Sequence, residues 1–265
     1  CNVIINSCKF IDCAGDSNEK NNFVIYGNSD HGKRLEIMKS EFSFTNTERS
    51  CSGICLEIYC TFHVFSCNFT NCWANLGEDY SGCIKYGPDD TNINIAMQIL
   101  CRFEISRCIF DNCNNIDSIN TGRVIYARPA QPTNIISYCE IKNTVNGGYI
   151  FQWEFYSREH EFTLKDFYFE NNQACCADGG GAGILILKST KLEFLNCHFI
   201  RNKQTNSTSH GGAFTCPIRT DASNQETLFD NCHFEDNSVP DGEINGGALC
   251  LRALFIVTVR KCTFT

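Results

Sequence analysis

The chain has 265 residues, of which 43% are hydrophobic and 20% are charged, so it is long and apolar enough to bury a substantial core. The net charge of −8 and the lack of any run of Lys or Arg argue against nucleic acid or an anionic membrane surface as a partner. No apolar stretch approaches the roughly 20 residues of a membrane-spanning helix.

Cysteine is the most unusual feature of the composition. The chain contains 20 cysteines but no Cys-x-x-Cys pair, which argues against a zinc ribbon or a thioredoxin-like redox site. Two N-glycosylation sequons begin at Asn68 and Asn206. Sequons and abundant cysteine together predict an extracellular or cell-surface protein. Because the chain starts at Cys1 without Met and stops within a repeat, we expect it to be an excerpt of a longer protein.

A short motif recurs from the first residues to the last: apolar residues that alternate, then Cys-x-Phe, then Cys or Asn five residues after the first Cys. We call the first position of Cys-x-Phe the anchor. Alternation on both sides of the anchor predicts two short strands, and the odd step between them predicts a bend. The anchors, including three degenerate copies, are Cys8, Ser40, Cys67, Cys108, Cys139, Phe167, Cys197, Cys232 and Cys262. They are separated by about 32 residues on average.

A Gly-rich segment followed by apolar residues lies between successive anchors. Glycine there suits a positive φ or a tight corner where the chain enters a third strand. Polar stretches of variable length, such as residues 203–210 and 239–245, precede this segment and absorb the differences in repeat length. The Gly-rich segments lie at 52–56, 81–84, 121–126, 147–151, 181–186, 211–214 and 246–250.

Together these elements predict an all-β fold, a right-handed parallel β-helix that forms one domain over residues 1–265. We expect about eight coils of roughly 30 residues with three short strands each. Two β-sandwich domains are the alternative, but sandwiches do not repeat side-chain identity at a fixed period. Coils stacked at about 4.8 Å place like residues over like. The expected core ladder is Phe10, Phe69, Phe110, Phe169, Phe199, Phe234 and Phe264.

Cysteines at equivalent positions of neighbouring coils allow two interpretations. A spacing of about 4.8 Å lies within the range for a disulfide, so the pairs can be bridges between coils. They can equally be reduced thiols that fill a ladder, as small buried side chains do. A zinc cluster is disfavoured, because thiols stacked on one face do not form a tetrahedron. The pairs are Cys60 with Cys101, Cys67 with Cys108, Cys72 with Cys113, Cys108 with Cys139, and Cys197, Cys232 and Cys262 in sequence.

Few residues offer catalytic or metal chemistry. His198 and His233 take the same outward position in successive copies, where two imidazoles can hold a transition metal or simply face solvent. Enzymes on this fold that act on polysaccharides need converging carboxylates, often with a basic residue. The segment at 30–34, with charges of both signs, and the acidic pair at 89–90 read as charged loops without a partner carboxylate. We therefore expect no active site, no metal and no cofactor.

The Gly-Gly-Ala and Phe-x-x-Asn motifs of the C-terminal third provide a resemblance. Gly211–Phe214, residues 246–249, and the Phe-x-x-Asn copies that start at Phe169, Phe199 and Phe234 are similar to those of the chlamydial polymorphic membrane proteins and related trichomonad surface proteins. The first 145 residues have Cys where that family has Asn. The resemblance implies a β-helix passenger region displayed on a cell surface, with adhesion as its usual role.

We therefore expect a non-enzymatic structural or adhesive segment of a cell-surface or secreted protein. Its expected partners are further coils of the same longer protein and a protein or glycan ligand that contacts its loops. A component of an extracellular filament or other assembly, with neighbouring copies as partners, is one alternative. A polysaccharide lyase or hydrolase is the other.

Overall fold

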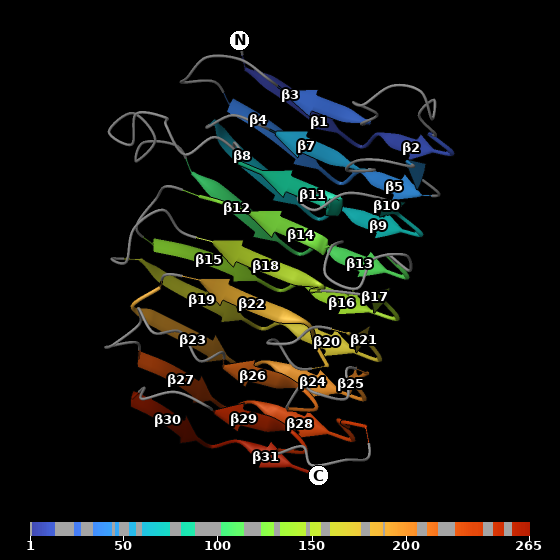
Figure 1. Ribbon diagram of the computed structural model, residues 1–265. Coiled ribbons are helices and arrows are strands. Elements are labelled where there is room, and N and C mark those ends of the chain that lie inside the picture. Colours follow the sequence, from blue (N-terminus) through green and yellow to red (C-terminus); the bar gives the residue numbers. More distant parts are fainter. Residues whose placement is uncertain are drawn as a thin grey trace.

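Strands stacked in successive layers form the whole described part of the protein (Figure 1). The structure is a computed structural model. It describes residues 2–13, 24–27, 34–43, 46–47, 53–56, 60–74, 81–87, 102–113, 123–129, 133–146, 149–154, 160–175, 181–187, 189–205, 211–216, 226–240, 246–251 and 256–265. Within these ranges every regular element is a β-strand, and all strand pairs are parallel.

Two nine-stranded sheets run along the stack and contain the strands on either side of each anchor. The first sheet consists of β1 (Val3–Asn6), β4 (Arg34–Met38), β8 (Thr61–Phe65), β12 (Phe103–Ser106), β15 (Thr133–Ser137), β19 (Glu161–Lys165), β23 (Lys191–Leu195), β27 (Glu226–Asp230) and β30 (Ile256–Arg260). The second consists of β2 (Lys9–Ile11), β5 (Glu41–Ser43), β9 (Asn68–Thr70), β13 (Ile109–Asp111), β16 (Glu140–Lys142), β20 (Tyr168–Glu170), β24 (His198–Ile200), β28 (His233–Glu235) and β31 (Thr263–Phe264).

The Gly-rich segments lead into a third set of strands. A six-stranded sheet contains β3 (Ile25–Gly27), β7 (Ile54–Leu56), β11 (Ser81–Tyr86), β14 (Arg123–Ala127), β18 (Phe151–Glu154) and β22 (Ile184–Leu187), and β26 (Phe214–Cys216) pairs with β29 (Leu249–Leu251). Two-residue strands after the second sheet are an addition to the predicted three per coil: β6 (Asn46–Thr47), β10 (Trp73–Ala74), β17 (Val145–Asn146), β21 (Gln173–Ala174) and β25 (Lys203–Gln204).

The strand register sets equivalent residues of the repeat beside one another. Phe10 pairs with Phe42, Phe69 with Phe110, and Phe199 with Phe234. The predicted parallel β-helix is therefore confirmed. The two long sheets contain nine layers rather than about eight, because nine anchors define eight intervals.

Among the described residues, the chain turns through left-handed backbone conformations at two kinds of position, directly before each anchor and four residues after seven of the anchors. Their φ values lie between 49° and 57°, a region that Asn and Asp tolerate better than other non-glycine residues. The bend predicted between the first two strands is the first of these corners. The residues before the anchor are Ser7, Lys39, Ser66, Arg107, Tyr138, Asp166, Asn196, Asn231 and Lys261, and those after it are Asp12, Asn71, Asn112, Asn143, Asn171, Arg201 and Asp236.

Glycine in the Gly-Gly-Ala motif is required by two different constraints. Gly211 has a φ of +71° and Gly246 one of +82°, so a side chain would be strained at either position. Gly212 is limited by space instead, because a Cβ there would lie 1.9 Å from the carbonyl oxygen of Gly247 in the next coil. The motif thus marks a corner where neighbouring coils lie too close for a side chain at Gly212.

Candidate functional site

The phenylalanine ladder fills the centre of the coils. Ring centroids are 4.8 Å apart for Phe10 and Phe42, and also for Phe199 and Phe234, whose planes differ by 2°. The ladder is buried through most of its length, whereas Phe10 is half-buried and Phe264 is 50% exposed at the last layer. Its members are Phe10, Phe42, Phe69, Phe110, Phe169, Phe199, Phe234 and Phe264, with Ile141 at the equivalent position between Phe110 and Phe169.

Buried asparagines form an internal ladder five residues after the anchor. The Nδ2 of Asn202 donates to the carbonyl oxygen of Phe169 at 2.8 Å and to the Oδ1 of Asn237 at 3.0 Å. Its own Oδ1 accepts from the backbone N–H of Asn172 at 3.2 Å. The Asn172 side chain donates in the same way to the carbonyl of Ile141. The ladder therefore satisfies backbone groups that the corner leaves unpaired.

Cysteines replace these asparagines in the N-terminal half and use the same acceptors. The Sγ of Cys72 lies 3.4 Å from the carbonyl oxygen of Phe42, and the Sγ of Cys113 lies 3.5 Å from that of Phe69. Each of these carbonyls belongs to the preceding coil's member of the phenylalanine ladder, as it does for the asparagines. Thiol and carboxamide are thus alternative donors to one repeated acceptor.

The anchor cysteines serve the other corner. The Sγ of Cys108 lies 3.3 Å from the carbonyl oxygen of Ser106 and 3.7 Å from that of Val64 in the previous coil. Cys67, Cys197, Cys232 and Cys262 repeat this pattern. The described ranges contain no disulfide, and the anchor thiols follow one another from coil to coil. Of the pair Cys60 and Cys101, Cys60 is buried and Cys101 lies outside the described residues.

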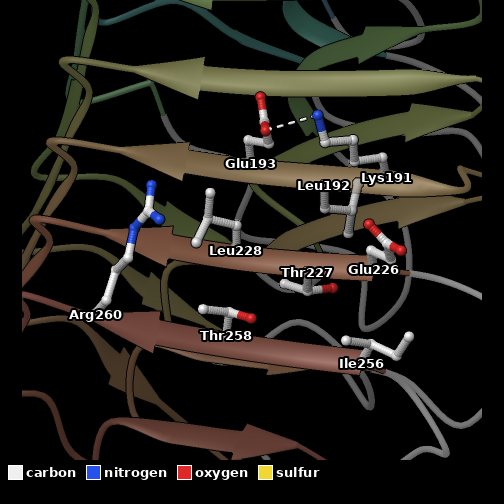
Figure 2. Close-up of a pocket in the computed structure, with 9 residues that line it drawn as sticks. All are labelled: Lys191, Leu192, Glu193, Glu226, Thr227, Leu228, Ile256, Thr258 and Arg260. Carbon is white, nitrogen blue, oxygen red and sulfur yellow. Dashed lines mark ion pairs between the residues drawn. The ribbon is translucent and has the colours of Figure 1, made fainter.

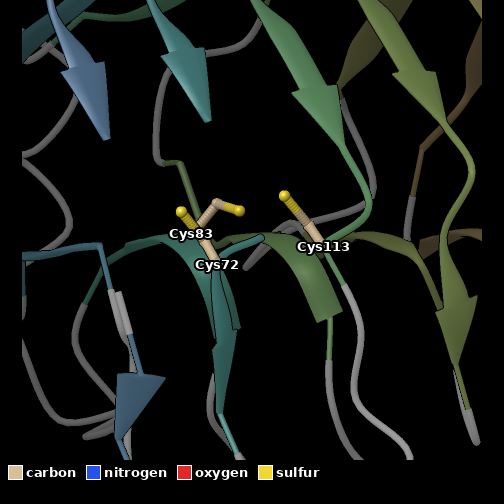
Figure 3. Close-up of side chains that lie close together, drawn as sticks. All are labelled: Cys72, Cys83 and Cys113. Carbon is tan, nitrogen blue, oxygen red and sulfur yellow. The ribbon is translucent and has the colours of Figure 1, made fainter. Parts of the chain in front are cut away.

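A third thiol meets the Cys72 and Cys113 pair from a different sheet. Cys83 lies on β11, and its Sγ is within 4.8 Å of the sulfurs of both other residues (Figure 3). All three side chains are buried. The expectation that neighbouring thiols stack on one face is wrong for Cys83. The repeat does not fix the position of Cys83, because β11 has a register shift between Ser81 and Ile84.

The thiol cluster has a low-polarity setting that favours the protonated state. Burial raises the pKa of the Cys83 thiol well above its ordinary value, and hydrogen bonding with Cys113 and Cys72 raises it further. Burial likewise raises the pKa of the Cys113 thiol. The Cys83 and Cys113 thiols are therefore neutral at physiological pH.

The outer face of the first sheet carries a row of ionisable side chains. His63 on β8 lies between two glutamates: its Nδ1 is 3.7 Å from the Oε1 of Glu36, and its Nε2 is 3.6 Å from the Oε2 of Glu104. These atoms are too far apart for ordinary hydrogen bonds. Glu36, His63 and Glu104 thus form a row of ionisable side chains on three successive coils. Solvent reaches the row, because the Glu104 side chain is 53% exposed.

A shallow groove of about 200 Å³ lies near the C-terminal end of the same face (Figure 2). Leu228 and Ile256 form its apolar part, and Glu226 and Arg260 lie at its sides. Lys191 forms an ion pair with Glu193 at 2.8 Å, and Arg260 forms one with Asp230 at 2.8 Å. The groove is smaller than the roughly 300–1,000 Å³ of typical small-molecule sites and offers mixed charge beside an apolar floor.

The two predicted histidines lie on the second sheet. His198 stacks on Tyr168 with ring centroids 4.3 Å apart, while its ring lies 5.9 Å from that of His233. His233 is instead engaged by Glu235, whose Oε2 is 3.0 Å from Nε2. Burial lowers the pKa of His198, and the neighbouring His233 lowers it further. His198 and His233 thus belong to a row on the second sheet in which His198 contacts Tyr168 and His233 contacts Glu235.

The remaining predicted positions are exposed or undescribed. The Asn68 side chain is exposed on β9, where a glycan can be accommodated. Asn206 and the acidic segment 89–90 lie outside the described residues, and of the segment 30–34 only Arg34 is described. In the described part of the chain, no helix has the length and apolar character to cross a membrane.

Fold and register define a parallel β-solenoid protein. A family model described as "Right handed beta helix region" matches residues 79–219, which is more than half of the chain. The protein therefore belongs to the right-handed β-helix family. No curated protein and no solved structure matches the chain.

Proposed function

We propose that this β-helix is a non-enzymatic structural and adhesive segment of a cell-surface or secreted protein. The observation that carries the proposal is the outer face of the first sheet, where rows of polar and apolar side chains continue over nine strands. Because the coils are cross-linked by hydrogen bonds and stacked rings, this face is rigid and needs little ordering to bind a partner. A region similar to the polymorphic membrane proteins fits this role, and further coils of a longer protein would extend the same face.

The C-terminal groove supports surface contact as the mode of binding. Its floor of Leu228 and Ile256 suits the apolar face of a sugar or a protein side chain. Glu226 and Arg260 supply hydrogen bonds at its sides. A groove of about 200 Å³ leaves most of a bound glycan or peptide outside it. This favours contact with one part of a large ligand over enclosure of a whole small molecule.

Binding and turnover assays test this proposal together. We expect the purified chain to bind a subset of an array of glycans and cell-surface proteins, and to leave acidic polysaccharides uncleaved. Arg260→Glu should weaken binding at the groove without abolishing it, because the contact surface is long. Thr61→Ser on β8, a conservative change on the same sheet, is the control. Cleavage of a polysaccharide that is lost with a single Glu226→Gln substitution would instead establish an enzyme.

A component of a filament or other repeating assembly is the second candidate. An exposed apolar side chain on the outer face of the first sheet favours it, because Ile135 on the interior strand β15 is 52% exposed there. Imaging of the intact cell surface and concentration-dependent light scattering distinguish it from an adhesin. Ordered end-to-end arrays would support assembly, and a monomer that still binds its ligand would support adhesion alone.

A further inference from the structure

We propose that Cys72, Cys83 and Cys113 form a binding site for one Cu(I) ion with three sulfur ligands. The three sulfurs lie within 4.8 Å of one another and come from two sides of the coil. They surround a common point, which a metal ion needs and which a single stacked row does not provide. This site is independent of the adhesive role proposed above.

Comparison with the anchor cysteines shows why the third thiol matters. Cys67, Cys108 and Cys139 occupy the same position in three successive coils, so the outer two are about 9.6 Å apart at a coil spacing of about 4.8 Å. Such a row cannot place three sulfurs around one ion. The triangle exists because Cys83 on β11 reaches the row of Cys72 and Cys113 from the third sheet.

The size of the triangle suits one small ion. A metal in the plane of three sulfurs at a metal–sulfur distance of about 2.3 Å requires sulfurs about 4 Å apart. The sulfurs of the cluster lie within 4.8 Å, so a contraction of less than about 1 Å closes the site. Rotation of the side chains achieves this without moving the backbone. Cys72 and Cys113 then exchange their contacts with the carbonyls of Phe42 and Phe69 for the metal.

The number and type of ligands select the ion. Soft sulfur ligands favour Cu(I) and Zn(II) among the common metals. Zn(II) in structural sites takes four ligands, and the cluster in the described part of the chain has three. The site is buried, so water is poorly placed to supply a fourth ligand. Cu(I) is a d¹⁰ ion that accepts three-coordinate geometry, and it is the ion that this triangle fits.

The reaction balances without an oxidant. One Cu(I) ion replaces the protons of two thiols, which leave to solvent, and the third sulfur binds as a neutral thiol. Two copper–thiolate bonds and one weaker copper–thiol bond form, and the copper stays monovalent. The complex carries one net negative charge, which is the smallest that two thiolate ligands allow.

Competition with a Cu(I) chelator tests the proposal on the full 265-residue chain. The reduced protein, free of oxygen, is titrated with Cu(I) held by bathocuproine disulfonate. We expect one ion per chain to transfer from the chelator, and an X-ray absorption spectrum with a sulfur shell at about 2.3 Å. Cys83→Ser should weaken binding by more than about 100-fold, since loss of even a supporting residue around a metal weakens it 10- to 100-fold.

Cys108→Ser is the matched control, because Cys108 is equally buried and belongs to the linear row. Equal loss in Cys108→Ser and Cys83→Ser would overturn the proposal, as would nitrogen or oxygen ligands in the spectrum. If Cys83→Ser does not fold, alkylation of the wild-type protein in mild denaturant followed by mass spectrometry decides the matter. Cu(I) should then protect Cys72, Cys83 and Cys113 but not Cys67, and equal protection of all four would contradict the site.

Discussion

Replacement of Asn202 tests whether the internal polar ladder holds the corners together. In Asn202→Val, the backbone N–H of Asn172 and the carbonyl of Phe169 both lose the hydrogen bonds that the carboxamide provides. Each buried group left without a partner costs about 1–3 kcal/mol, so we expect a loss of about 2–6 kcal/mol in the free energy of unfolding. Urea denaturation followed by circular dichroism measures this loss.

Asn202→Cys is the informative comparison, because the N-terminal half of the chain has cysteine at this position. A thiol there should donate to the carbonyl of Phe169, as the Cys113 thiol does to that of Phe69. One of the two lost bonds is restored, and the expected destabilisation falls to about 1–3 kcal/mol. Amide hydrogen exchange at Asn172 should accelerate in both variants. The reasoning is refuted if Asn202→Cys is as unstable as Asn202→Val.

Three further predictions test separate features of the fold. Gly212→Ala should lower the melting temperature strongly, because the added Cβ would lie 1.9 Å from a carbonyl oxygen. Gly247→Ala should leave the melting temperature nearly unchanged, because no atom lies within 4 Å of the added Cβ. Phe199→Ala should lower the free energy of unfolding, measured by urea denaturation, by about 3–5 kcal/mol, and Phe264→Ala should lower it clearly less because Phe264 is half-exposed. Equal losses in the two variants would contradict the ring ladder. By NMR titration the pKa of His198 should lie below 6.5 and rise part of the way in His233→Gln, since burial remains. The unfolded chain binds the His198 proton more readily, so this histidine contributes stability above about pH 6.5 that is lost as pH falls below it; a pKa above 6.5 would reverse the sign.

The strands next to the anchor could be predicted from sequence because their period is regular. Alternating apolar residues before Cys197 and Cys232 determine which side chains point inward. The repeat of about 32 residues determines that each of them stacks on the equivalent residue of the neighbouring coil. The recurrence of Phe199 and Phe234 thus placed both rings correctly in the core. Local pattern and long-range register agree in this part of the coil.

The third side of the coil could not be predicted to the same depth. Segments of variable length precede its strands, and the register shift in β11 breaks the count from the anchor to Cys83. The meeting of Cys83 with Cys72 therefore depends on tertiary packing and not on spacing. The sequence does carry a signal for the corners: polar residues such as Asp166, Asn196 and Asn231 stand directly before the anchor, where the backbone is left-handed.

The shared carbonyl acceptor at the corner has an evolutionary consequence. Several coils present the same backbone carbonyl to the next one, and a thiol at Cys72 and Cys113 or a carboxamide at Asn172, Asn202 and Asn237 donates to it. A duplicated coil inserted beside its parent would consequently meet compatible neighbours above and below from the first generation. Such a gene can lengthen or shorten its rod by whole turns, and can exchange cysteine for asparagine at this position, with no redesign of the backbone.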